Sequence, residues 1–259
     1  MKIAKKTTTF TKTITFQMRK IIYLFLLIFV FSCQTIKVKN DSFKTSKSNL
    51  ELGVLGESKS LLGFKNNFQT NAFITLNEKI KVEAAIVPFT KQINKVYQEK
   101  AKFNQNLAKV KYVDSLPNKP EAVSLKIADI SLLVNELNKD FNYKQYIFIK
   151  DNERTSIITS LLVYLNQEEL NKIRLADSYY LIQTDVAKYN IALYKQGKKV
   201  DVVDLATSTI LGYEVSKFCW SESQKGKWQI GDIVNKNSSC KGETYSKIKS
   251  KKEKSLYKM

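Results

Sequence analysis

The second half of the chain alternates apolar and polar residues over four short segments, and this pattern constrains the fold more than any other feature of the sequence. Alternation with a period of two is typical of a strand with one buried and one exposed face. Short polar connections, such as Thr184-Asp185 and Gln196-Gly197, separate the segments as in antiparallel hairpins. The sequence therefore predicts an antiparallel meander over residues Tyr179–Gln183, Tyr189–Lys195, Lys199–Leu205 and Thr209–Lys217.

Three segments that precede the meander also carry strand patterns. Two alternate apolar and polar residues, and the third is rich in the β-branched and aromatic residues that favour a central strand. These segments are Ile80–Ile86, Val123–Ile127 and Thr155–Leu165. We expect Ala72–Leu76 to pair with the first of them as a hairpin.

Helical patterns follow these three strand segments. Thr90 is placed to cap a helix with an apolar residue at every fourth position, Asp129–Asn138 has helical spacing, and Asn166 resembles the first residue of a capping box. Phe141–Ile149 fits either a helix or a strand. We therefore expect the fold class α+β: a single domain with a mainly antiparallel sheet, a C-terminal meander, and two or three helices packed on one face.

The first 33 residues have the composition of an export signal. Six basic residues and no acidic ones precede an apolar run of eleven, Ile21–Phe31, and a small residue and Cys33 end it. A helix of that length covers about half of the ~30 Å hydrocarbon core of a bilayer, so a permanent transmembrane helix is not expected. Translation from Met1 and translation from Met18 would both leave this signal intact.

The end of the apolar run, Val30-Phe31-Ser32-Cys33, resembles the lipobox of bacterial lipoproteins. The resemblance implies a signal peptide over residues 1–32, cleavage before Cys33 and a lipid on the Cys33 thiol. It also implies an outer-membrane lipoprotein, because Gln34 and not an aspartate follows the cysteine. We expect it to face the periplasm, because basic Ile36-Lys-Val-Lys39 stands where an acidic cluster marks surface export. The alternative is an ordinary secretory signal in which Cys33 is incidental.

Polarity and charge divide the rest of the chain into three parts. Residues 33–60 are Ser- and Lys-rich and predict a flexible tether after the lipidated cysteine, residues 61–240 carry the α+β patterns, and residues 241–259 predict a basic, disordered tail.

The formal net charge is +19, but Arg154 and Arg174 are the only arginines after the signal segment. Because arginine is the residue best suited to phosphate and base recognition, a nucleic-acid partner is not expected.

The chain contains no histidine, which excludes Ser-His-Asp and Cys-His catalysis and histidine-ligated zinc. No motif predicts a catalytic residue, a metal site or a cofactor, and we expect a protein that is not an enzyme. Paired carboxylates are the one remaining route to glycan hydrolysis. The candidates near predicted element ends are Asp129, Glu136, Glu153, Asp177 and Asp185.

Cys219 and Cys240 are the only other cysteines, and we predict that they form a disulfide because an exported protein folds in an oxidising compartment. The alternative is two free, buried thiols. Trp220 adjoins the first cysteine and Trp228 lies inside the loop, so both tryptophans of the chain are found here. Exposed tryptophans would make the loop a binding surface, whereas buried ones would pack it onto the sheet.

These observations lead us to expect a lipid-anchored cell-envelope protein that acts as a non-enzymatic binding or assembly component. The expected partners are the membrane, through the lipid on Cys33, and another envelope protein or a glycan. Two alternatives stay open: a carboxylate-dependent envelope glycan hydrolase, and a polyanion binder that uses the lysine-rich tail.

Overall fold

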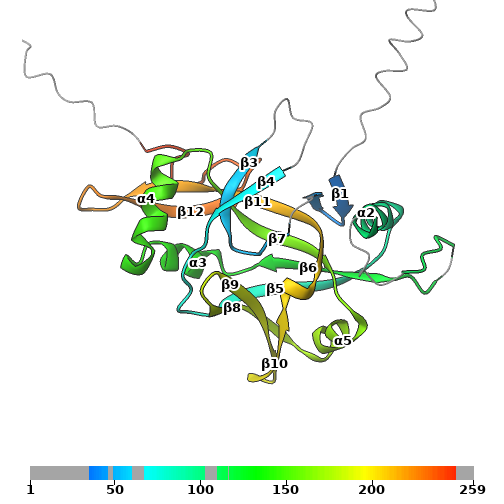
Figure 1. Ribbon diagram of the computed structural model, residues 1–259. Helices are drawn as coiled ribbons and strands as arrows, with labels where there is room; N and C mark the ends of the chain where they lie inside the picture. Colours follow the sequence, from blue (N-terminus) through cyan, green and yellow to red (C-terminus); the bar gives the residue numbers. More distant parts are fainter. Residues whose placement is uncertain (1–34, 46–48, 60–66, 103–109, 116, 249–259) are drawn as a thin grey trace, which may run out of the picture. The chain divides into compact units, whose positions relative to one another are not determined.

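The computed structural model describes residues 35–45, 49–59, 67–102, 110–115 and 117–248. The strands among these residues form one sheet in which every pairing is antiparallel (Figure 1). Its main path is β1-β2-β11-β7-β6-β5-β8-β9-β10, while β12 pairs with β11, and β3 pairs with β4 and β7. The strands are β1 (Thr35–Val38), β2 (Asp41–Lys44), β3 (Leu55–Lys59), β4 (Asn67–Ala72), β5 (Ile80–Pro88), β6 (Glu121–Ile127), β7 (Ser156–Tyr164), β8 (Ser178–Asp185), β9 (Lys188–Lys195), β10 (Lys198–Asp204), β11 (Thr209–Glu222) and β12 (Trp228–Asn235).

Four α-helices accompany the sheet in the described part of the chain, more than the two or three predicted. The fold is α+β with a mainly antiparallel sheet, as the sequence predicts. Three of the helices begin at a side-chain cap, and the sequence predicts two of these caps, Thr90 and Asn166. The side-chain oxygens of Thr90, Asp129 and Asn166 each accept a hydrogen bond from the backbone N–H three residues on. The segment that fitted either state is helical. The helices are α2 (Lys91–Ala101), α3 (Ile130–Leu137), α4 (Tyr143–Asp151) and α5 (Gln167–Leu175), with short 3-10 turns η1 (Asp140–Asn142) and η2 (Leu205–Thr207).

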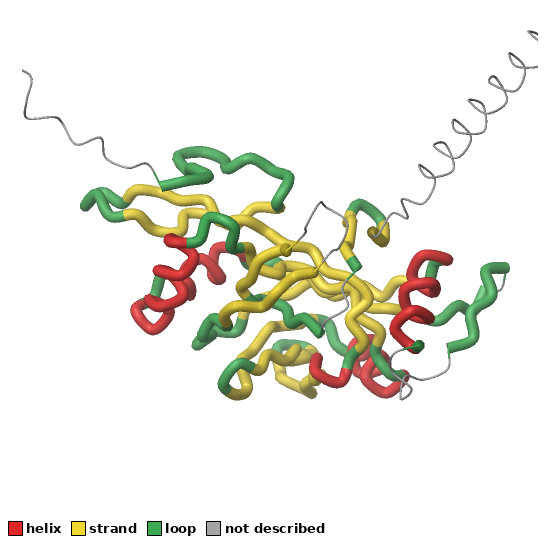
Figure 2. Tube along the Cα trace, turned by 45° about the horizontal axis from the view of Figure 1, so that its top comes forward, coloured by secondary structure: helices red, strands yellow, loops and turns green. Residues whose placement is uncertain are grey.

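Both faces of the sheet are covered, which corrects the expectation that all helices pack on one face. The central strand β7 is buried on both sides: Leu161 and Val163 join the core that contains α3, α4 and α5, whereas Leu162 joins a second core that contains α2. All residues of β7 except the last are buried, so each side of the strand needs a cover. Figure 2 shows the helices at several positions around the strands rather than in a single layer.

The predicted meander is right for three strands and wrong for the fourth. β8, β9 and β10 pair in succession, as expected. β11, however, does not pair with β10; η2 turns the chain away, and β11 pairs with β7, β12 and β2. The reason is burial, because most residues of β11 are buried and a place beside the edge strand β10 would leave one of its sides unpaired.

The predicted hairpin between Ala72–Leu76 and the strand that follows is wrong. β5 pairs with β6 and β8, and the chain before it is held by side chains instead of by a ladder. Asn142 accepts from Thr75 N at 2.8 Å and donates to Thr75 O at 2.8 Å, and Gln183 accepts from Leu76 N at 2.8 Å. Since these side chains satisfy the backbone groups, the segment needs no partner strand.

The predicted tether over residues 33–60 is also wrong where the structure describes it. β1 and β2 form a hairpin whose Ile36 and Phe43 are 1% and 0% exposed, and β3 begins within the same range. Gly212 of β11 lies under this hairpin, where a Cβ atom would stand 2.7 Å from the Phe43 Cβ. The sequence gives no clear signal for the hairpin, because each of its strands has only four residues, too few for a sustained alternation.

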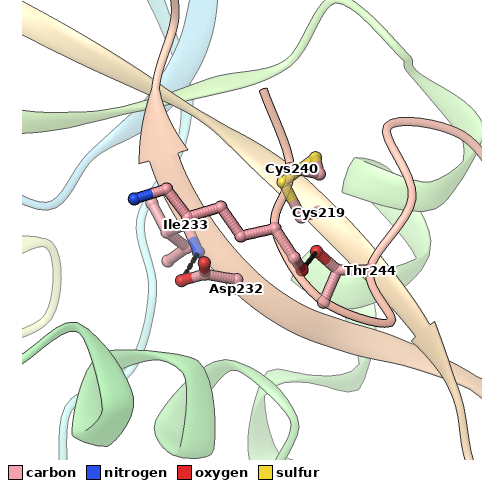
Figure 3. The surroundings of a disulfide bond; sticks show 6 residues. Cys219, Asp232, Ile233, Cys240 and Thr244 are labelled. Carbon is pink, nitrogen blue, oxygen red and sulfur yellow. Dashed lines mark hydrogen bonds between the residues drawn. A yellow bond between two sulfur atoms is a disulfide. The ribbon is translucent and has the colours of Figure 1, made fainter. Parts of the chain in front are cut away.

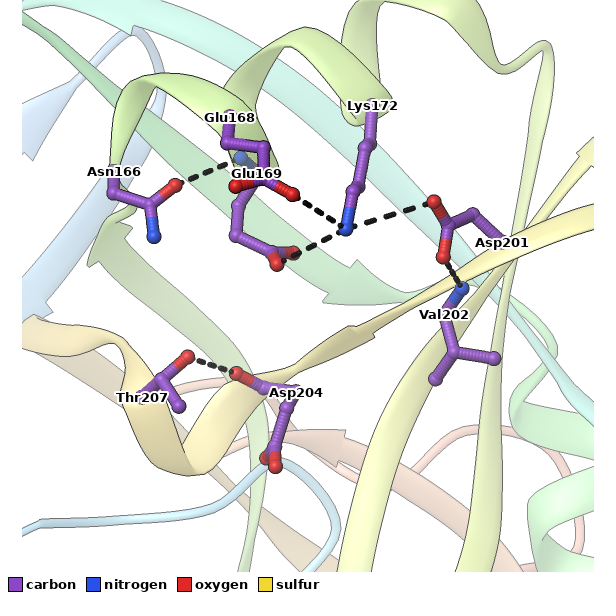
Figure 4. A network of polar contacts seen from close by, with 8 residues as sticks. All are labelled: Asn166, Glu168, Glu169, Lys172, Asp201, Val202, Asp204 and Thr207. Atoms are coloured by element: carbon purple, nitrogen blue, oxygen red, sulfur yellow. Dashed lines mark hydrogen bonds and ion pairs between the residues drawn. The ribbon is translucent and has the colours of Figure 1, made fainter.

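A charged network fastens α5 to β10 at the other end of the sheet (Figure 4). Lys172 Nζ lies 3.4 Å from Glu168, 3.3 Å from Glu169 and 3.6 Å from Asp201, which is on β10. Leu170 and Ile173 on the opposite side of α5 are buried in the main core. The network therefore has a structural explanation, because it neutralises the exposed side of a helix that the core already holds.

Candidate functional site

The disulfide between Cys219 and Cys240 is present, as the sequence predicts (Figure 3). Cys219 is buried on β11, and Cys240 follows β12, the neighbouring strand. Their Cα atoms are 5.7 Å apart, within the usual range for a disulfide. The bridge therefore joins β11 to the chain that follows β12.

The chain after Cys240 folds back onto β11. Trp220 N donates to Tyr245 O at 2.7 Å, and Tyr245 N donates to Trp220 O at 2.8 Å. Residues 241–248 are thus fixed by one covalent bridge and a pair of backbone hydrogen bonds, which corrects the prediction of a disordered tail over this part. The remaining tail, residues 249–259, lies outside the described residues, and so does the polyanion-binding role assigned to it.

The two tryptophans differ in exposure. Trp220 is 5% exposed, with its ring edge-on to Tyr146 at a centroid distance of 5.8 Å, so it offers little surface to a ligand. Trp228 is partly buried, its ring meets Tyr245 at 6.1 Å, and its backbone oxygen accepts from the Tyr146 hydroxyl at 2.6 Å. Both residues therefore contribute to packing residues 241–248 and the end of β11, and Trp228 is the more exposed of the two.

A cavity of about 260 Å³ lies beside Trp220. The end of α4, the start of β7, strand β11 and residues 246–248 surround it. One wall is apolar and consists of Ile149, Phe218, Trp220 and Ile248. The sequence pointed to this region through its cysteines and tryptophans, but the contribution of α4 has no sequence signal, because α4 lies some 70 residues earlier in the chain.

The carboxylates considered for hydrolysis have structural partners. Glu136, only 2% exposed, accepts from Asn77 N at 2.7 Å and from Glu78 N at 3.2 Å, and Asp129 caps α3. Each of the others also accepts a hydrogen bond from a neighbouring group; these are Glu153, Asp177 and Asp185. The arrangement supports a role for all five in fixing loops and helix ends.

Glu214 is a buried carboxylate that sequence reasoning missed. It lies on β11 between apolar neighbours, is 9% exposed, and accepts a hydrogen bond from Ser42 N at 2.8 Å. Burial raises the pKa of its carboxyl; the Ser42 hydrogen bond opposes this and the nearby Asp41 carboxylate adds to it. Glu214 thereby links the β1–β2 hairpin to the centre of the sheet.

The raised pKa of Glu214 makes a prediction about pH. The folded protein holds a proton on Glu214 above the ordinary pKa of 4.5, so the free energy of unfolding falls as pH rises from that value through the folded pKa. Glu214→Gln keeps an oxygen that can accept from Ser42 N, but the amide cannot ionise. We expect the free energy of unfolding of this variant to depend less on pH than that of wild type, and to be at least as large as that of wild type at pH 7. Urea unfolding at a series of pH values measures the slope. Glu243→Gln, at an exposed position, is the matched control; a wild-type slope in Glu214→Gln would contradict the assignment.

No family model, curated protein or solved structure matches this chain. Within the residues that the structure describes, no three His, Cys, Asp or Glu side chains gather as a metal site requires. None of the described helices combines the length and the apolar character needed to cross a bilayer. The features that bear on function are therefore the distribution of cysteines and the cavity beside Trp220.

Proposed function

We propose that this chain is a lipid-anchored cell-envelope protein, held at the bacterial outer membrane through Cys33 and facing the periplasm, and that it acts as a non-enzymatic binding or assembly component. The observation that carries the proposal is how the three cysteines are used. Two of them form the disulfide at the edge of the sheet, and the third is Cys33. That residue lies outside the described part of the chain, directly after the apolar run and its lipobox-like sequence.

The disulfide supports export, because such bonds persist mainly in oxidising compartments. A stable bridge would require the body to cross the inner membrane, and an export signal at the N-terminus is the means. Because the bridge leaves Cys33 without a cysteine partner inside the chain, a lipid is the modification that the surrounding sequence favours. The binding role rests on the cavity beside Trp220, which is bordered by residues held by the disulfide and by the backbone hydrogen bonds between Trp220 and Tyr245.

Replacement of the anchor cysteine tests the proposal. In bacterial cells fed labelled palmitate, the wild-type protein is expected to take up the label and to have a mature mass that begins at Cys33 and includes the attached acyl chains. Cys33→Ser is expected to lose the label completely, because the hydroxyl does not replace the thiol that accepts the diacylglyceryl group. Cys219→Ser is the matched control, since it also removes a cysteine but keeps the label.

The labelling and mass measurements distinguish a lipoprotein signal from an ordinary secretory signal in residues 1–32. A wild-type protein that is exported but carries no label would mean that Cys33 is incidental to an ordinary secretory signal. A wild-type protein that keeps residues 1–32 and stays in the cytosol would overturn the export assignment as well.

A further inference from the structure

The cavity beside Trp220 carries an excess of positive charge. Lys150 at the end of α4, Lys217 on β11 and Lys247 all line it, against a single carboxylate, Glu153. That carboxylate is already paired with Lys247 at 2.5 Å. Throughout the described residues, no carboxylate lies within ion-pair distance of Lys150 or Lys217. Two cationic groups at the rim are therefore available to an anion.

A buried hydroxyl in the same cavity also lacks a partner. Thr155, the residue before β7, is 4% exposed, and its Oγ1 has no hydrogen-bond partner among the described residues. Leaving a buried polar group unpaired is costly, so such groups are rare unless something else satisfies them. Thr155 is one of the residues that line the cavity, so its unpaired hydroxyl is close to any ligand held there.

Besides the polar Asn152 and Ser246, the lining includes four apolar residues, and the space is small. Ile149, Phe218, Trp220 and Ile248 offer a surface for a hydrocarbon or a ring, and the volume of about 260 Å³ lies below the roughly 300–1,000 Å³ of sites for drug-sized ligands. A bare inorganic ion would leave this apolar wall uncovered.

We propose that this cavity is a binding site for a small organic anion, with a carboxylate or a phosphate between Lys150, Lys217 and the Thr155 hydroxyl and an apolar group against Phe218 and Trp220. The site depends on the disulfide, because residues 246–248 that close it are held to β11 through Cys240 and the Tyr245 pairing. The site lies in the folded body and needs no lipid. The proposal of an anion site therefore goes beyond the proposed function, and the two can be tested independently.

The chain's two tryptophans provide the test, since Trp220 lines the cavity and Trp228 does not. The full chain, labelled with ¹⁵N at the tryptophan indoles, is titrated with phenylacetate, with phenyl phosphate, and with neutral benzyl alcohol. We expect at least one anion to shift the Trp220 indole resonance to saturation, and benzyl alcohol to leave it in place. Saturation by one anion alone distinguishes a carboxylate site from a phosphate site. If neither anion shifts Trp220, or if the alcohol shifts it equally, the proposal is wrong.

Substitutions then test the polar contacts. Lys217→Gln and Thr155→Val are each expected to weaken binding of the effective anion by roughly tenfold, the effect of one charge-assisted hydrogen bond. Lys225→Gln, in the exposed turn between β11 and β12, is the matched control and should bind as wild type does. Lys150→Gln, at an exposed position, replaces Lys217→Gln if that variant does not fold. Wild-type affinity in the lysine and threonine variants would overturn the assignment.

Discussion

Replacing both Cys219 and Cys240 with Ser is expected to lower the free energy of unfolding by about 3 kcal/mol, because the bridge closes a loop of 21 residues and restricts the unfolded chain. Equilibrium unfolding in urea, comparing the oxidised wild type with the double variant, measures the difference. The same change should speed hydrogen exchange at the Trp220 and Tyr245 amides, which pair only while residues 241–248 stay on β11.

Ser239→Ala is the matched control for this experiment, since it alters the exposed residue next to Cys240 and leaves the bridge in place. It should change the free energy of unfolding by less than about 0.5 kcal/mol. If the double variant unfolds at the wild-type urea concentration, the bridge contributes nothing to stability. If hydrogen exchange at the Tyr245 amide is also unchanged, residues 241–248 are held on β11 by something other than the disulfide.

Phe43→Ala is expected to cost about 3–5 kcal/mol, the range for removing an aromatic side chain from a core. Phe43 is 0% exposed and packs in the second core with Ile36 and with Leu162 of the central strand. The backbone under it belongs to Gly212, so no side chain can move into the space that its ring leaves. Thermal or urea unfolding measures the loss.

Lys37→Ala provides the comparison on the same hairpin, because Lys37 is exposed and should change stability by less than about 0.5 kcal/mol. The pair of variants decides whether this region is part of the body or a tether. A tether has no core to lose, so equal stabilities for Phe43→Ala and Lys37→Ala would restore the interpretation made from composition.

The regular parts of the fold could be predicted from the sequence. β5, β6 and β7 follow clear strand patterns, and the starts of α2, α3 and α5 are marked by Thr90, Asp129 and Asn166, since alternation and capping are local properties. The disulfide could be predicted because only two cysteines remain after the leader's own. The same local rules gave no information on which strand would neighbour β11.

Apart from the β1–β2 hairpin, whose strands are too short to give a pattern, the missed features depend on contacts between distant residues. Gln183 accepts from Leu76 N across 107 positions, and Glu214 accepts from Ser42 N across 172. No window of sequence contains both partners, so neither the strandless segment before β5 nor the burial of Glu214 has a local signal. The cavity is similar, because its lysines come from α4, β11 and the segment after the disulfide.

The early start of β1 has a consequence for how such a protein would sit on a lipid bilayer. β1 begins at Thr35, so on the proposed anchoring only Gln34 separates the acylated residue from the first strand, and two extended residues reach at most ~7 Å. A connection that short would limit how far the body can move from the bilayer. It would keep the β1–β2 hairpin next to the phospholipid headgroups, with the exposed Lys37 and Lys39 on that hairpin. The attachment point alone would then select which side of the protein touches the membrane and which side is presented to the periplasm.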